Sequence, residues 1–142
     1  MSTNKSISIV MPVRNEAGCI AAQLQRLQAY RRRGHELIVV DGGSTDDTVQ
    51  LTAGLVDSCE SGESGRSRQM NQGAASAEAD VLLFLHADTE LPEDADQLII
   101  EALAAQSSRW GWFDVRLSNS GLPYRVVAGM MNLRSRLTSV CT

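Results

Sequence analysis

The sequence is poor in cysteine, and the three cysteines that it has are far apart. Cys19, Cys59 and Cys141 form no C-x-x-C pair, and their number is odd. This pattern indicates neither a disulfide framework nor a structural zinc site, and it is typical of a protein kept in a reducing compartment. We therefore expect a cytoplasmic location.

Long apolar runs are also missing. A helix needs about 20 consecutive apolar residues to cross a bilayer, and no stretch of the 142 residues approaches that length. The apolar run near the N-terminus ends at Pro12, so we expect it to be too short for a signal peptide. Any contact with a membrane is expected to be made from its surface.

Positive charge is scarce over most of the chain. Up to residue 108 there are 8 Lys and Arg against 16 Asp and Glu, and beyond it there are 5 against 1. Proteins that bind nucleic acids usually carry a dominant basic surface. This balance therefore argues against a nucleic-acid partner, although it leaves a basic C-terminal face.

Two nucleotide-binding fingerprints are absent as well. The sequence contains neither the G-x-G-x-x-G pattern of dinucleotide-binding enzymes nor the G-x-x-x-x-G-K-[ST] loop of P-loop NTPases. Their absence counts against NAD-dependent enzymes and against P-loop proteins.

What the sequence does have is an alternation of short apolar runs and amphipathic segments. With 43% apolar residues, a chain of this length can form one domain with a substantial core. The run at 81–85 contains no polar residue, so we expect a central strand that is buried on both faces. The predicted strands cover residues 7–11, 37–40, 55–59, 81–85 and 110–117.

Helix signals lie between these runs. Ile20, Leu24 and Leu27 are spaced i, i+4 and i+7 and form one apolar stripe. The segment 44–47, Ser-Thr-Asp-Asp, matches a capping box, which predicts a helix that begins there and runs past Leu51. Strands that alternate with helices indicate an α/β fold with a mostly parallel sheet. Further helices are predicted over residues 67–79, after Pro92, and over 124–137, where the segment is amphipathic and basic.

Polar side chains follow three of the predicted strands. Arg14 and Glu16 come after the first strand, Asp41 after the second, and Asp88 after the run at 81–85. Ligands of open α/β sheets bind at the carboxyl edge of the strands, so these side chains together predict a nucleotide site. Asp88, with a polar side chain two residues before it, is suited to hold a hard divalent cation against a phosphate.

Four segments, taken in order, resemble the successive motifs of family 2 inverting glycosyltransferases of the GT-A fold. Two later segments, 111–116 and 130–138, further resemble the bacterial arsenosugar-biosynthesis-like subfamily, and the likeness runs from about residue 6 to residue 138. The four segments are Ile-Val-Met-Pro-Val-Arg-Asn-Glu at 9–16, Val-Val-Asp-Gly-Gly-Ser-Thr-Asp-Asp-Thr at 39–48, Gly-Arg-Ser-Arg-Gln-Met-Asn at 65–71 and Phe-Leu-His-Ala-Asp at 84–88.

The resemblance implies a Rossmann-like GT-A fold, in which helices flank a mostly parallel central sheet. Residues 1–142 would form a single domain, with a nucleotide-sugar-binding part at 1–108 and the start of an acceptor-side part at 109–142. The resemblance also implies a nucleotide-diphospho-sugar donor of UDP or GDP type and an Mg²⁺ or Mn²⁺ cofactor. The sugar would pass with inversion to an acceptor that the sequence does not identify.

The same resemblance assigns roles to individual residues. Pro12 and Glu16 would line the nucleoside pocket, and Asp41 would accept a hydrogen bond from the base. Asp88 would be the metal-binding end of a DxD motif whose first position is His86, and imidazole can contact a ribose or a metal-bound water. The full nucleotide-sugar set is Pro12, Arg14, Glu16, Asp41, Arg66, Arg68, His86, Ala87 and Asp88.

Structural interpretations of these residues stay open. Arg66 and Arg68 are candidates for the diphosphate, which arginine binds in bidentate fashion, but exposed arginines also form solvated faces. Asp41 and Asp88 precede turn-forming residues, and aspartate favours such turns without any ligand.

An inverting transfer requires a general base near the acceptor hydroxyl. In the subfamily that the chain resembles, this base is a carboxylate that follows the Arg-Ser-Arg-Leu-Thr motif, and the sequence ends four residues after Thr138. We therefore expect a truncated chain without its usual base, in which Asp114 is the remaining candidate.

The sequence leaves two other functions open. One is a non-catalytic nucleotide-binding or dimerising remnant, in which the helix at 124–137 would form a homodimer contact or touch a membrane surface. The other is a sugar-phosphate nucleotidyltransferase, which would need a glycine-rich loop directly after the first strand. Residues 12–15, Pro-Val-Arg-Asn, do not form such a loop.

Overall fold

The structure is a computed structural model that describes residues 5–105, 109–114, 116–118 and 121–138. The chain divides into two compact units, Met1–Ile100 and Glu101–Thr142, and each is described by itself. The first unit contains the whole described sheet. No helix in these ranges is both long enough and apolar enough to span a bilayer.

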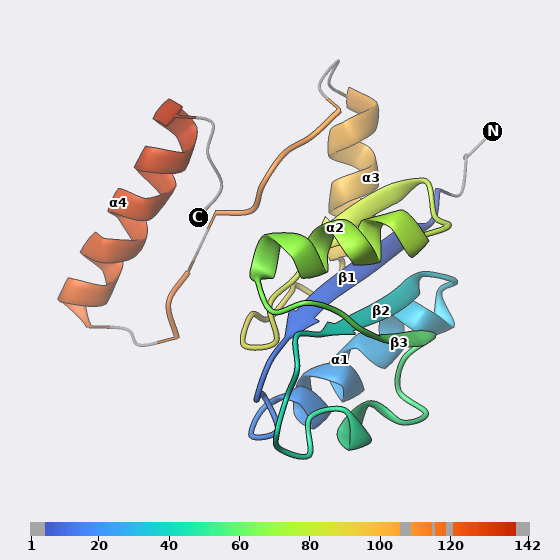
Figure 1. The fold of residues 1–142 in the computed structure, drawn as a ribbon. Helices are drawn as coiled ribbons and strands as arrows, with labels where there is room; N and C mark the ends of the chain where they lie inside the picture. The colour runs from blue at the N-terminus through green and yellow to red at the C-terminus, as the bar shows by residue number, and fades with distance from the viewer. Residues whose placement is uncertain (1–4, 106–108, 115, 119–120, 139–142) are drawn as a thin grey trace. The chain divides into compact units, whose positions relative to one another are not determined.

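A four-stranded parallel sheet forms the centre of the first unit (Figure 1). β1 (Ile7–Val13) pairs with β2 (Glu36–Asp41) from Ser8↔Glu36 to Val13↔Asp41, and with β4 (Val81–Phe84) from Ile7↔Val81 to Val10↔Phe84. Because all strands run in one direction, their carboxyl ends meet at the same edge, as predicted for an α/β fold. The strands, in their order across the sheet, are β3 (Ser58–Ser61), β2 (Glu36–Asp41), β1 (Ile7–Val13) and β4 (Val81–Phe84).

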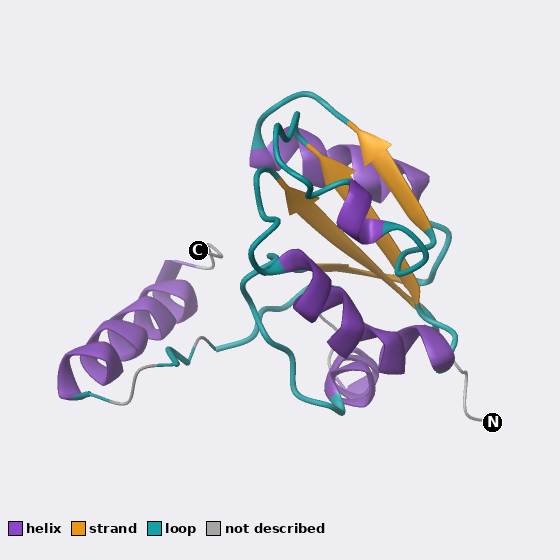
Figure 2. Cartoon of the chain, turned by 90° about the horizontal axis from the view of Figure 1, so that it is seen from below, coloured by secondary structure: helices purple, strands orange, loops and turns teal. Residues whose placement is uncertain are grey.

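Helices cover both faces of this sheet (Figure 2). On one face the predicted stripe of Ile20, Leu24 and Leu27 is buried against alternate residues of β1, beginning with Ile7 and Ile9. On the other face the buried side chains come from the intervening residues, such as Val10. The helices are α1 (Ile20–Arg32), the one-turn 3₁₀ helix η1 (Gln50–Thr52), α2 (Arg66–Ser76), α3 (Ala95–Ala105) and, in the second unit, α4 (Leu122–Thr138).

α2 packs against the sheet at very short range. A Cβ atom on Gly73 would lie 2.4 Å from Cγ1 of Val10 and 3.1 Å from Cγ2 of Val40. Any side chain at this position would force the helix or the strands to move. Gly73 therefore allows α2 to lie this close to the sheet.

β4 is more exposed than the sequence predicts. It lies at the edge of the described sheet, where Leu82 and Phe84 are 44% and 45% exposed. Val81 and Leu83 are half-buried, because they face the core that α1 covers. An apolar strand is buried on both faces only where other elements cover both, and at β4 the described residues of the first unit cover one. The prediction of a central strand buried on both faces is therefore wrong for this sheet.

Two further predictions are corrected. The capping-box segment at 44–47 starts no α-helix, because residues 44–49 form turns and bends that lead into η1. The aromatic segment at 110–117 is not a strand in its described part, 110–114 and 116–117. The predicted strand at 55–59 lies later, at β3, and the basic amphipathic helix predicted at 124–137 is confirmed as α4.

Replacement of Gly73 by alanine should destabilise the protein by about 1–3 kcal/mol, which is the usual cost of forcing an extra carbon into a packed core. Gly129 in α4 is the matched control, because nothing lies within 4 Å of the Cβ position there. Gly129→Ala should leave stability unchanged or raise helicity, since alanine is the better helix former. Urea unfolding followed by circular dichroism compares the two, and equal effects would contradict the packing described here.

Candidate functional site

An open cleft of about 260 Å³ lies at the carboxyl edge of the sheet. It lies between the end of β1 and the loop that joins β3 to α2. Residues about 50 positions apart in the sequence, such as Arg14 and Ser64, therefore meet there. Its lining residues are Pro12, Val13, Arg14, Glu16, Ser64, Gly65, Arg66 and Gln69. The predicted nucleotide site is at this edge.

The loop after β1 is held in place by the loop after β2. The backbone N–H groups of Asn15 and Glu16 donate to Ser44 Oγ and Thr48 Oγ1, each at 2.8 Å. Asn15 has a left-handed backbone with φ of 54°, and its side-chain oxygen accepts from the N–H of Thr45 at 2.8 Å. The polar side chains at 44–48 thus satisfy donors just before α1, which is why they do not cap a helix of their own.

Asp41 is engaged by its own turn. Its carboxylate accepts hydrogen bonds from the N–H of Gly43 at 3.1 Å, from the N–H of Ser44 at 3.0 Å and from the Ser44 hydroxyl. The residue is buried and does not line the cleft. This is the turn-forming arrangement that aspartate favours, and a contact between Asp41 and a base stays a prediction.

The two predicted diphosphate arginines differ in their surroundings. Arg66, the first residue of α2, lines the cleft, whereas Arg68 forms an exposed ion pair with Glu63 at 2.6 Å and does not line it. Arg14 reaches across from the other side and donates to the neutral Ser64 hydroxyl at 2.6 Å. Neither Arg14 nor Arg66 belongs to an ion pair among the described residues, so both are available to an anion.

Electrostatics connect the loop after β4 to the same cleft. Burial lowers the pKa of His86, and the charge of Arg66 lowers it further, while Asp88 and Glu16 act in the opposite direction. Burial raises the pKa of the Cys19 thiol, and Glu16 and then Asp88 add to this effect. Such interactions fade over about 10 Å at ordinary ionic strength. The loop 86–88 therefore lies near Glu16 and Arg66, with a neutral imidazole at pH 7.

Asp88 fits a metal ion that is shared with a phosphate. Its carboxylate is exposed and accepts a hydrogen bond from Thr89 Oγ1 at 3.3 Å. Within the described residues, no three His, Cys, Asp or Glu side chains gather closely enough to hold a metal by themselves. Mg²⁺ and Mn²⁺ do not need such a cage, because they take carboxylate, water and phosphate oxygens together.

Side chains of α1, and Arg33 directly after it, hold the segment that follows β4 against the rest of the unit. Gln23 Nε2 donates to the carbonyl of Thr89, and the Tyr30 hydroxyl donates to the carbonyl of Pro92. Arg33 then donates to the buried carboxylate of Asp96 at 2.6 Å and to the carbonyl of Glu93 at 3.0 Å. The position of Asp88 therefore depends on contacts made several residues away.

Asp96 lies at the centre of this support. The N–H of Ile7 donates to His35 Nδ1 at 3.2 Å, so Nε2 carries the ring proton and donates to Asp96 at 2.9 Å. Burial acts to raise the pKa of Asp96, but the hydrogen bonds from Arg33 and His35 outweigh it, and the net shift is downward.

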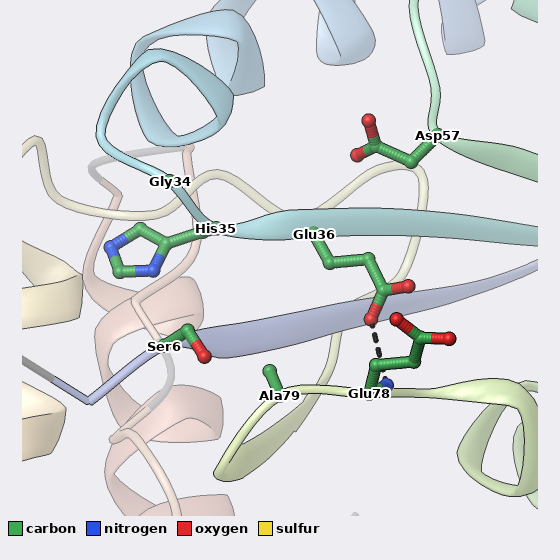
Figure 3. A pocket seen from close by; sticks show the side chains of 7 residues that line it. All are labelled: Ser6, Gly34, His35, Glu36, Asp57, Glu78 and Ala79. Carbon is green, nitrogen blue, oxygen red and sulfur yellow. Dashed lines mark hydrogen bonds between the residues drawn. The ribbon is translucent and has the colours of Figure 1, made fainter.

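A larger cavity, of about 370 Å³, lies at the opposite, amino edge of the sheet (Figure 3). Two of the three acidic side chains that line it, those of Glu36 and Asp57, already have structural partners. Glu36 accepts from the N–H of Glu78 at 3.1 Å, and Asp57 accepts from Arg31 at 2.7 Å and from the N–H of Leu37 at 2.8 Å. The carboxyl-edge cleft is therefore the better candidate, because its arginines are not committed in this way.

A sequence model of Glycosyl transferase family 2 matches residues 8–134, which is most of the chain. The chain belongs to this family. An uncharacterized glycosyltransferase of Mycobacterium tuberculosis is 34% identical over 125 residues, which cover 79% of this chain and 46% of that protein. The 4,4'-diaponeurosporenoate glycosyltransferase of Staphylococcus haemolyticus is 31% identical over 141 residues, which cover 92% and 37%. The family 2 chain thus spans about half or less of the length of these relatives.

Solved structures share the fold of this family 2 domain. Glucosyl-3-phosphoglycerate synthase from Mycobacterium tuberculosis, in complex with Mn²⁺, UDP and glucosyl-3-phosphoglycerate, has a TM-score of 0.62 and 23% identity, over 72% of this chain and 41% of that chain. Mannosyltransferase PcManGT from Pyrobaculum calidifontis, in complex with GDP-Man and Mn²⁺, has a TM-score of 0.63 and 22% identity, over 76% and 34%. The predicted GT-A fold is confirmed.

The structure brings together part of the predicted site. Pro12, Arg14, Glu16 and Arg66 line the cleft, and His86 and Asp88 lie within electrostatic range of it. Ala87 is buried between them. The second unit contains Asp114, which is paired with Arg136 of α4, and its role as a base stays a prediction.

Sequence reasoning missed four lining residues. Ser64 and Gly65 belong to the loop before α2, Gln69 to the first turns of that helix, and Val13 to the end of β1. A glycine just before a basic segment was a usable signal for the loop. Nothing in the sequence distinguishes Gln69 from Gln72, because a glutamine in a helix is ordinarily exposed.

Asp96→Asn should lower the free energy of unfolding at pH 7 by about 1.5–3 kcal/mol, the usual loss for hydrogen bonds to a buried charge. Because the folded pKa lies below the unfolded value of about 3.9, the contribution of Asp96 is fully present above that value. It disappears as the pH falls through the folded pKa.

Urea titrations at pH 7, 4 and 2.5 test this expectation. The difference between the wild type and Asp96→Asn should shrink below pH 4, and the exposed control Asp94→Asn should show little difference at any pH. A difference that stays constant down to pH 2.5 would contradict the assignment of a charged Asp96.

Proposed function

We propose that this family 2 domain binds a nucleotide-diphospho-sugar in the carboxyl-edge cleft and serves an inverting transfer of the sugar. The observation that carries the proposal is the meeting of three features in one place. Arg14 and Arg66 lie in the cleft outside any ion pair among the described residues, and Asp88 lies nearby with an exposed carboxylate. A diphosphate with a divalent cation matches this combination of charges.

Different walls of the cleft would bind different parts of the donor. The end of β1, with Pro12 and Glu16, would contact the nucleoside, while Arg14 and Arg66 would bind phosphate oxygens from opposite sides. The neutral imidazole of His86 can accept a hydrogen bond from a ribose hydroxyl or from a metal-bound water at one ring nitrogen and can donate one at the other, whereas a carboxylate in its place could only accept. The UDP and GDP-Man in the two similar structures support a donor of either type.

Asp88 is the residue that would hold Mg²⁺ or Mn²⁺. When bound, such an ion supplies positive charge that stabilises a departing diphosphate. The Mn²⁺ in the same two structures supports this choice of cofactor. Asp88 needs a fixed position to act in this way, and the contacts of Gln23 and Tyr30 with its loop provide one.

Transfer itself needs a base for the acceptor hydroxyl. Asp114, in the second unit, is the candidate within this chain, and its carboxylate forms an ion pair with Arg136. The motif likeness at 111–116 and 130–138 supports a place in the arsenosugar-biosynthesis-like subfamily. The acceptor, the sugar and the activity of the whole protein are part of the proposal, since the relatives are about twice as long or longer.

The protein should bind UDP or GDP more tightly with Mn²⁺ than in the presence of a chelator, because the cation neutralises charge between Asp88 and the diphosphate. ATP and NAD should bind weakly under both conditions. Isothermal titration calorimetry measures this directly, and a rise in melting temperature with ligand provides a second reading. Affinity that does not depend on the metal, or a preference for NAD, would exclude the proposed site.

Asp88→Asn should remove most of the benefit of Mn²⁺, by about tenfold or more in the dissociation constant, which corresponds to about 1.4 kcal/mol. Binding in the presence of chelator should stay unchanged or become somewhat tighter, since Asp88 is exposed, asparagine is nearly isosteric, and the substitution removes a negative charge near the diphosphate. Glu90→Gln is the control, because Glu90 lies on the same loop but pairs with Arg26. Equal losses for the two variants would show a general effect of charge rather than a metal ligand.

A further inference from the structure

Gln69 is a buried polar residue that lines the cleft. Its side-chain nitrogen donates to the carbonyl of Val13 at 2.9 Å and to the carbonyl of Val40 at 2.8 Å, so both hydrogens of the amide are used. These carbonyls belong to β1 and β2, close to the point where the pairing of the two strands ends at Val13↔Asp41. The amide therefore joins α2 to two strands at once.

The backbone around this amide is fitted to it. A Cβ atom on Gly42 would lie 2.8–2.9 Å from the Gln69 carboxamide, so a side chain there would displace the amide from the position in which it donates to both carbonyls. The N–H of Gly42 donates to the same Val13 carbonyl at 2.9 Å. Apolar packing alone does not require such a contact, because α2 is already seated on the sheet further along, at Gly73.

The hydrogen bonds of Gln69 join the two backbone segments that carry the cleft arginines, Arg14 and Arg66. Arg14 follows Val13 directly, and Arg66 precedes Gln69 by three residues, which is one turn of the helix. All three side chains line the cleft. A shift of the first turn of α2 relative to the end of β1 would change the separation between Arg14 and Arg66.

We propose that Gln69 is a positioning residue that fixes the spacing of Arg14 and Arg66 and thereby selects a diphosphate over a monophosphate. The inference rests on the proposed function, because it assigns the two arginines to the phosphates of the donor. Gln69 acts through the arginines and needs no contact with the ligand. A displacement of about 1 Å is enough to impair a site of this kind.

The test compares Gln69→Leu with Gln72→Leu. Gln72 is the matched control, since it lies one turn later on α2 and donates to Glu60 and to the carbonyl of Ser61, away from the cleft. Calorimetry is done at saturating Mn²⁺ with UDP, UMP, GDP and GMP. Gln69→Leu should weaken diphosphate binding by about tenfold or more, which is within the range measured for residues coupled in one hydrogen-bond network. Its effect on monophosphate binding should be much smaller. Gln72→Leu should change neither.

A double-mutant cycle with Arg66→Ala separates positioning from a general loss of structure. If Gln69 acts through Arg66, Gln69→Leu should cost little more once Arg66 has been removed. Additive losses, or equal losses of diphosphates and monophosphates, would overturn the inference. Gln69→Asn, which keeps the amide but is one carbon shorter, gives the same comparison if the leucine variant does not fold.

Trypsin provides a reading without any ligand. Gln69→Leu should speed cleavage after Arg66 and Arg68, because the first turn of α2 opens more often, whereas Gln72→Leu should not. If the wild type binds no nucleoside diphosphate, the proposed function fails and the selection of a diphosphate fails with it. The cleavage rates then still decide whether Gln69 holds the turn, and unchanged rates would overturn that part as well.

Discussion

Parallel pairing on both sides of β1 determines where the functional groups of the first unit lie. β2 and β4 run in the same direction as β1, so Pro12, Asp41 and the loop that begins after Phe84 leave the sheet at one edge. Side-chain periodicity then separates the two faces, with Ile9 toward α1 and Val10 toward α2. Every candidate residue of the cleft depends on this arrangement, and Pro12 belongs both to the strand pairing and to the cleft wall.

Pairing alone leaves the loops undefined, and side-chain to backbone hydrogen bonds complete them. Thr48 and its neighbours fix the loop after β1, Gln23 and Tyr30 fix the loop after β4, and Gln69 fixes the start of α2. Each bond joins a side chain to a backbone group in another part of the chain. The rigidity of the cleft therefore comes from residues that are not expected to touch the donor.

The sequence predicts those parts of the fold that depend on local pattern. The stripe of α1 and the first two strands are of this kind, and the shared strand edge follows from them. Prediction fails where a residue's partner is distant. The segment 44–47 has the letters of a capping box, but its side chains bind the loop after β1 instead. Gln69 resembles any helical glutamine until the carbonyls of Val13 and Val40 are known, and the exposure of β4 depends on what lies beside it.

Charge placement explains how an acidic chain can present a site for an anion. Two of the four arginines that form ion pairs in the described part of the first unit do so in structural positions, Arg31 with Asp57 and Arg33 with Asp96, and their charge is largely cancelled there. Arg14 and Arg66 are kept at the strand edge outside such pairs, so the local potential of the cleft differs from that of the chain as a whole. Asp88 and Glu16 lie close to them, and their negative charge would oppose a diphosphate. Burial also lowers the pKa of His86, so this side chain adds no positive charge at pH 7. Two arginines do not balance the negative charges of a diphosphate, Asp88 and Glu16 together, and a divalent cation beside Asp88 would be the simplest way to balance the remainder.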